Sequence, residues 1–116
     1  MLHLQIANTF LLRLFGLLAH GPLAPDEGLL LVPCRAVHTF FLGESIDIVF
    51  LDAQARECRC VHSLPPHCFA VQPDACMVVE LPSGYCRRHV DYLERIRAAL
   101  RPSVSLPLPT RAGRCR

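Results

Sequence analysis

The first regular pattern along the chain is an apolar run from Thr9 to Ala19 that is interrupted at helical intervals. The interrupting residues are four, three and four positions apart: Thr9, Arg13, Gly16 and His20. This spacing places them on one stripe of a helix whose remaining sides are apolar. The pattern therefore predicts a mostly buried helix over Thr9–Ala19, capped at Asn8 or Thr9 and ended by Gly21.

Short segments rich in β-branched and aromatic residues follow, each bounded by proline, glycine, aspartate or serine. Segments of this length and composition are typical of β-strands. The predicted strands are Leu29–Val32, Ala36–Leu42, Ile46–Leu51, Glu57–His62, His67–Val71 and Cys76–Leu81. Asp52–Arg56 is expected to be the hairpin loop that joins the third of these strands to the fourth.

The period changes after Gly84, where apolar residues recur three and four positions apart. This period predicts a helix from about His89 to Leu100. Because strands outnumber helices and follow one another directly, a βαβ arrangement is disfavoured. We expect a mainly β (α+β) fold: a small, curled, antiparallel sheet or a partly open barrel, with the N-terminal helix packed on it and a C-terminal helix.

The 116 residues are enough for one domain, and a hydrophobic content of 52% excludes a disordered chain. Residues 1–100 are expected to form that domain. Residues 101–116 hold three prolines and four arginines but no acidic residue, so we expect a disordered tail with a charge of +4. The rest of the chain carries eight arginines against ten acidic residues, which argues against a basic surface for nucleic acid.

The apolar run near the N-terminus raises the question of export or membrane insertion. Arg13 lies inside the run, and the residues before it lack the positive charge of a signal peptide. The run is also too short to span a bilayer. We therefore interpret it as part of the fold, with no membrane span, and expect a cytoplasmic protein.

Seven cysteines are many for this length, and an odd number leaves at least one thiol unpaired in a monomer. Free cysteine behaves as a small apolar residue, so we expect mostly reduced thiols in the core. One group has the ligand types that zinc prefers: Cys58, Cys60, His62, His67 and Cys68. On a regular strand the first three would share a face. Their spacing differs from that of the usual zinc site, so metal binding is the weaker hypothesis and we expect no cofactor.

A second group combines charged and polar residues in mostly apolar surroundings: Arg13, His38, Thr39, Asp47 and Glu80. Buried charges must be paired and hydrogen-bonded, since their desolvation is costly. We predict that Arg13, on the polar stripe of its helix, forms a partly buried ion pair with Asp47 or Glu80. The alternative is that the same residues form a binding site for a small anionic ligand.

Six short segments recur in the order and spacing of a known family: Arg13–Leu18, Glu27–Leu31, Cys34–Leu42, Ile46–Asp52, Leu64–Pro66 and Val78–Gly84. This ordered set resembles the DUF 192 family of bacterial and archaeal domains. The resemblance implies a compact, mostly antiparallel β fold with one or two short helices. Because the family has no agreed enzymatic activity, the resemblance implies no reaction. Many relatives are thought to be exported, which leaves the cell envelope as an alternative location.

The chain departs from the family pattern in two places. Gly43, Glu44 and Ser45 stand where a basic residue is usual, so a negative charge replaces a positive one. Tyr85–His89, followed by the predicted helix, stands where a Gly-Asp pair usually ends the domain. A ligand that depends on the missing basic residue is expected to bind this chain differently or not at all.

These observations favour a non-catalytic binding or accessory module, whose partner is an unidentified protein or a small anionic ligand. No residue is assigned a catalytic role. The alternative is a small metal-binding protein or enzyme that uses the Cys/His-rich strand. Metal analysis and a thiol titration of the reduced protein distinguish the two.

Overall fold

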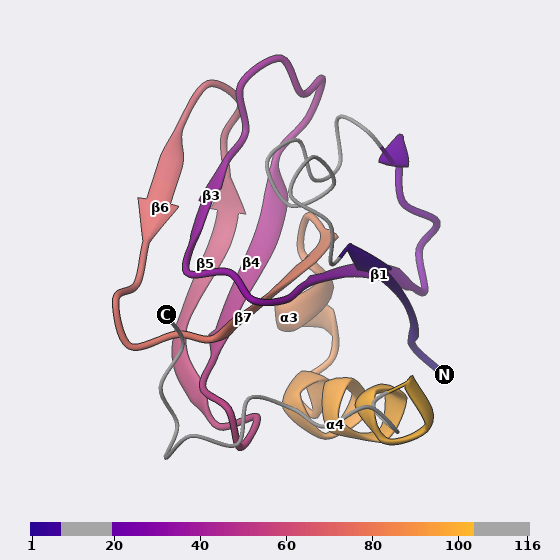
Figure 1. The fold of residues 1–116 in the computed structure, drawn as a ribbon. Helices are drawn as coiled ribbons and strands as arrows, with labels where there is room; N and C mark the ends of the chain where they lie inside the picture. The colour runs from indigo at the N-terminus through magenta and orange to yellow at the C-terminus, as the bar shows by residue number, and fades with distance from the viewer. Residues whose placement is uncertain (8–19, 104–116) are drawn as a thin grey trace.

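The computed structural model describes residues 1–7 and 20–103, which form a mainly β fold with its helices at the C-terminal end (Figure 1). The strands in this part of the chain are β1 (His3–Ala7), β2 (Glu27–Leu31), β3 (Ala36–His38), β4 (Ile46–Leu51), β5 (Glu57–Leu64), β6 (Phe69–Val71) and β7 (Met77–Pro82). The helices are α3 (Tyr85–Arg88) and α4 (Tyr92–Ser103). The strands form an open five-stranded sheet in the order β1-β2-β7-β4-β5 and a two-stranded sheet of β3 and β6.

Most of the predicted strands are confirmed. The segment predicted at Ile46–Leu51 is β4, and the Asp52–Arg56 loop joins it to β5 as predicted. The Asp52 N–H closes that loop by donating to the Arg56 carbonyl at 3.0 Å. β2, β5, β6 and β7 differ from their predicted ranges by one or two residues at an end, whereas β3 stops at His38 instead of Leu42.

The described residues do not confirm the prediction of an N-terminal helix packed on the sheet, because the two helices whose bounds they give, α3 and α4, are C-terminal. The predicted range Thr9–Ala19 itself lies outside the described residues. Part of the role assigned to that helix, covering a face of the sheet, is taken by α4, whose Ile96, Ala99 and Leu100 are buried. α4 ends at Ser103, so the first residues of the predicted tail are helical.

The sheet is not antiparallel throughout. β1, which no sequence pattern predicts, pairs with β2 in a parallel register, while the other neighbours in the sheet are antiparallel. The close packing at this edge depends on Gly28, where an added Cβ would lie 2.8 Å from the Leu4 side chain and 2.9 Å from that of Leu81. A five-residue edge strand is too short to show a clear period in the sequence.

The main sheet separates two apolar clusters. The helix-side cluster joins residues of β4 and β7 to Tyr85 and Cys86 of α3 and to the buried face of α4. The small-sheet cluster joins the opposite face of the main sheet to Val37 of β3 and Ala70 of β6. β4 is buried along its whole length because it lies between β7 and β5 and is covered on both faces. None of the helices described is long and apolar enough to cross a membrane.

Candidate functional site

Two of the charged residues singled out from the sequence, Asp47 and Glu80, do not meet at one site. Asp47 is paired with Leu81 across β4 and β7, and the next pair along is Ile48 with Glu80. Paired residues share a face and neighbours along a strand alternate, so Asp47 and Glu80 lie on opposite faces of the main sheet. Asp47 faces the helices, and Glu80 faces the small sheet.

Asp47 holds the start of α3. Its fully buried carboxylate accepts hydrogen bonds from three backbone N–H groups: Ser63 at 2.8 Å, Gly84 at 3.1 Å and Cys86 at 2.9 Å. The first amides of a helix have no partner within the helix itself. Asp47 therefore caps α3 from a neighbouring strand, and backbone donors compensate for its buried charge.

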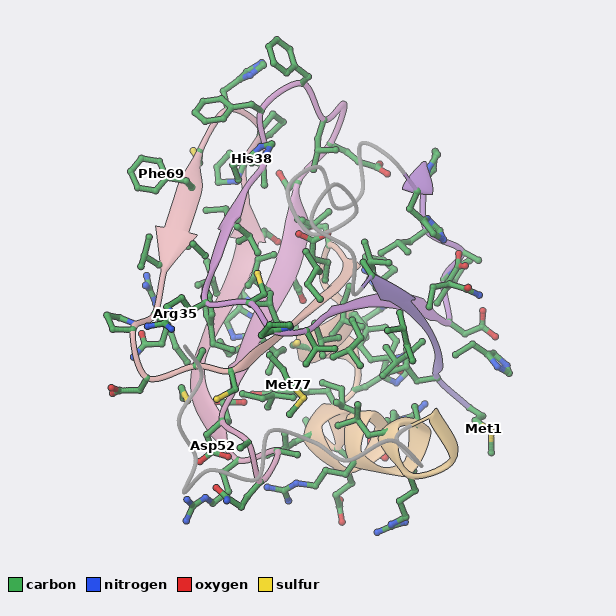
Figure 2. The ribbon with its side chains drawn as sticks, in the orientation of Figure 1. Met1, Arg35, His38, Asp52, Phe69 and Met77 are labelled. Atoms are coloured by element: carbon green, nitrogen blue, oxygen red, sulfur yellow. The ribbon has the colours of Figure 1, made fainter. Side chains whose placement is uncertain are left out.

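Thr39 and His38 contribute to the junction between β3 and β6. Thr39 is fully buried, and its hydroxyl donates to the Pro65 carbonyl at 2.5 Å and accepts from the Cys68 N–H at 2.9 Å. The His38 ring stacks against Phe40 with a centroid distance of 5.5 Å. His38 is also paired with Phe69 across the small sheet, and the two lie at the same end of the molecule (Figure 2). These contacts give Thr39 a structural role.

Glu80 is 2% exposed, on the face that packs against the small sheet. Arg13 lies outside the described residues, so its ion pair with Asp47 or Glu80 stays a prediction. A ligand site that combines Asp47 with Glu80 is disfavoured, since the sheet itself separates the two carboxylates.

The Cys/His group is divided by irregularities in β5. The register of β4 against β5 shifts between Phe50 and Leu51, where Cys58 is the extra residue. A bulge of this kind turns the following side chains to the other face. Cys58 accordingly packs against the small-sheet cluster and Cys60 against the helix-side cluster, so the expectation that they share a face is wrong. Within the described residues, no three His, Cys, Asp or Glu side chains are placed to hold a metal ion.

A pocket of about 630 Å³ lies where β4 begins and β7 ends. The described residues that line it come from three parts of the chain: the segment before β2, the segment before and at the start of β4, and the end of β7 with Ser83 and with Arg88 of α3. Most of these lining residues are apolar, among them Pro22, Leu23, Leu42 and Ile46. Arg88, Glu44, Ser45 and Ser83 supply charge and hydroxyl groups. We call this cavity the Arg88 pocket.

The position of Arg88 depends on the turn that begins α3. Gly84 has a φ of +84°, and a Cβ added there would lie 2.9 Å from Nη1 of Arg88. The guanidinium therefore lies over the glycine, and its Nη1 donates to the Ser83 carbonyl at 3.2 Å. The Ser83 hydroxyl is 2.8 Å from that of Ser63. The sequence marks Glu44, Ser45 and Arg88 only as departures from the family pattern, and nothing in it indicates that they line one cavity.

The strands and helices define a small, mainly β domain with an open main sheet. The family model of DUF192, described as Uncharacterized ACR, matches residues 1–91, and the chain belongs to this family. No curated protein is significantly similar to it in sequence.

Two solved structures share the fold. A protein of unknown function from Novosphingobium aromaticivorans has a TM-score of 0.64 at 20% identity, over 75% of this chain and 67% of that one. A protein from Sinorhizobium meliloti named as a "putative transcription regulator" has a TM-score of 0.66 at 20% identity, over 73% of this chain and 71% of that one. At this level of identity the likeness shows the fold alone.

Proposed function

We propose that the protein is a non-catalytic binding module and that the Arg88 pocket holds a small ligand with an apolar body and one carboxylate. The cavity of about 630 Å³ carries this proposal. Pockets for small molecules typically enclose roughly 300–1,000 Å³ and combine an apolar wall with a few polar groups. The Arg88 pocket has this size and this composition.

The charges of the pocket favour a particular kind of ligand. Arg88 can bind a carboxylate through two parallel hydrogen bonds, which orients the ligand. Glu44 lines the same pocket and repels a second negative charge. A monoanion with an apolar chain, and with a hydroxyl or ammonium group at the Glu44 side, satisfies both residues.

The lining residues argue against catalysis at this place. Those described include no cysteine or histidine. The Ser83 hydroxyl has the hydroxyl of Ser63 as its partner, instead of an imidazole that would activate it as a nucleophile. The alternative of a metal-binding protein or enzyme on the Cys/His-rich strand is weakened by the bulge that separates Cys58 from Cys60.

The name of the Sinorhizobium meliloti protein raises nucleic-acid binding as another candidate. Residues 1–100 carry more acidic residues than arginines, and a nucleic-acid surface needs a basic patch on the fold. We therefore place the ligand in the pocket and assign no nucleic-acid partner.

Binding of octanoate, measured by calorimetry and by chemical shifts of the folded protein, tests the proposal, with octanol as the uncharged analogue. Arg88→Gln should weaken octanoate binding about tenfold and leave octanol unchanged, because it removes the charged hydrogen bonds. Arg87→Gln is the matched control, since Arg87 is exposed on α3 and does not line the pocket. Equal losses in both variants, or octanoate binding no tighter than octanol, would contradict the proposal.

A further inference from the structure

Two cysteine thiols from distant parts of the sequence meet on the helix side of the main sheet. Cys60 lies in β5 opposite Val49 of β4, and Cys86 lies in the first turn of α3. Both belong to the helix-side cluster, where Val49 lies on the same face of β4 as Asp47, whose carboxylate accepts from the Cys86 N–H. The two thiols lie close enough for each to shift the pKa of the other. Cys60 is partly exposed, whereas Cys86 is 3% exposed.

The two thiols have different surroundings: polar side chains lie near Cys60, and a hydrogen bond fixes the backbone of Cys86. Sγ of Cys60 lies 3.8 Å from Nε2 of His62, and Tyr92, which packs against the same cluster, donates from its hydroxyl to the Glu57 carboxylate. The backbone N–H of Cys86 is fixed by Oδ2 of Asp47 at 2.9 Å. The accessible thiol therefore has an imidazole nitrogen close to its sulfur, and the backbone of the buried thiol is held by Asp47.

The pKa values of the two thiols are shifted in opposite directions. The interaction with the Cys86 thiol lowers the pKa of Cys60, although partial burial of Cys60 acts the other way. The hydrogen bond to Cys60, together with burial, raises the pKa of Cys86. A thiolate is the reactive form of cysteine, so Cys60 is the nucleophile of the pair.

We propose that Cys60 and Cys86 form a redox-active dithiol that exchanges with small disulfides of the glutathione class and closes an intramolecular disulfide. This site lies apart from the Arg88 pocket and does not depend on the proposed ligand. The juxtaposition of an accessible and a buried thiol in one cluster supports it.

The exchange has two steps. The Cys60 thiolate attacks one sulfur of the small disulfide, whose S–S bond breaks, and the departing thiolate takes up a proton. The Cys86 thiol then gives up its proton and attacks the Cys60 sulfur, which releases the second small thiol. The protein dithiol is oxidised by two electrons, and the small disulfide is reduced to two thiols.

The first step prepares the second. The main cause of the raised pKa of Cys86 is its hydrogen bond to Cys60. Once Cys60 is part of a neutral mixed disulfide, it no longer benefits from a proton on Cys86. The buried thiol then loses its proton more easily and lies next to the sulfur that it attacks.

Cys58 is the internal comparison, because it lies only two positions from Cys60 but faces the other cluster. Burial, together with the charge of Asp52, raises the pKa of its thiol. Its Sγ lies 3.8 Å from the Asp74 carbonyl, an acceptor that stabilises the protonated form. Cys58 is therefore expected to react much more slowly than its neighbour.

The test treats the full, reduced chain with glutathione disulfide and follows it by intact mass and peptide mapping. The wild type and Cys58→Ser should lose the mass of two hydrogens and yield a Cys60–Cys86 cross-linked peptide. Cys86→Ser should stop at a glutathione adduct on Cys60, and Cys60→Ser should leave Cys86 unmodified.

Circular dichroism shows whether each variant folds. If a variant does not fold, the peptide map of the wild type still shows whether the Cys60–Cys86 disulfide forms. Adducts that form first on Cys58, Cys34 or Cys68 would overturn the proposal. A folded wild type in which Cys60 and Cys86 stay reduced at the end of the reaction would do so as well.

Discussion

At the scale of single residues, burial decides which polar side chains stabilise the fold. Asp47, Thr39 and Glu80 are the buried polar or charged residues of the described chain, and the first two are held by backbone hydrogen bonds. Such bonds compensate for the loss of water, since an unpaired buried group is costly. The most informative substitution is therefore at Asp47, which joins β4, β5 and α3.

Replacing Asp47 by alanine should destabilise the protein by about 3–5 kcal/mol, because it leaves the N–H groups of Ser63, Gly84 and Cys86 without their acceptor. Urea unfolding measures the change. Asp74→Ala is the control, since Asp74 is exposed and should shift the free energy of unfolding by less than about 0.5 kcal/mol. Similar losses in both variants would show that Asp47 is not an anchor.

At the scale of elements, turns and bulges place the side chains that matter. One bulge in β5 separates Cys58 from Cys60, and the turn at Gly84 places Arg88 at the wall of the pocket. Both depend on a few residues whose backbone geometry is unusual. Substitutions in the turn at Gly84 and in the β4–β5 loop test how much these two turns contribute to stability.

The Gly84 turn disfavours a side chain, because φ is +84° and an added Cβ would displace the Arg88 guanidinium. Gly84→Ala should destabilise the protein by roughly 1–2 kcal/mol and also weaken octanoate binding. Gly43→Ala is the matched control, since Gly43 lines the same pocket with open space around it. Thermal unfolding and calorimetry should separate the two variants, and an unchanged Gly84→Ala protein would contradict this account.

The β4–β5 hairpin should depend on pH through Asp52. Burial opposes ionisation of its carboxyl, but hydrogen bonds from the Arg56 and Gln54 amides and the Arg56 guanidinium together lower its pKa below the usual 3.8. The stabilisation is therefore complete above pH 3.8 and is lost as the pH falls through the lowered value. The wild type should be more stable than Asp52→Asn at about pH 7, and the difference should shrink towards about pH 2.5. If the difference in the free energy of unfolding between the two proteins did not change with pH, Asp52 would not have the lowered pKa that this prediction rests on.

At the scale of the whole molecule, two apolar clusters on either side of one sheet hold the domain together. The C-terminal helix belongs to the helix-side cluster through Ile96, Ala99 and Leu100. α4 continues to Ser103, past residue 100, where the sequence predicts that the domain ends.

Removing residues 104–116 should leave the free energy of unfolding unchanged within about 0.5 kcal/mol, since α4 and its buried face stay intact. Removing residues 96–116 should instead abolish cooperative unfolding, because it deletes three buried side chains of the core. Denaturant unfolding of the two truncated chains provides the comparison. A large loss in the shorter truncation would mean that the tail contributes to the folded domain.

The sequence by itself determined the class of fold, most of the strands, the β4–β5 hairpin, the C-terminal helix and the family. These features are local: β-branched and aromatic segments, turn residues and a helical period act on the chain within a few positions. The strand at Ile46–Leu51 is the clearest case, since its apolar residues are bounded by serine and aspartate and it folds as predicted.

Only the tertiary structure decided which residues meet. The parallel pairing of β1 with β2 brings together segments separated by many residues, and no local pattern encodes it. The register of β4 with β7 puts Asp47 and Glu80 on opposite faces, and the bulge in β5 does the same to Cys58 and Cys60. The Arg88 pocket and the Cys60–Cys86 pair likewise join distant segments. Packing of the whole core determines which of these segments lie next to each other. Strand register adds to this, because a shift of one residue moves a side chain to the opposite face of the sheet.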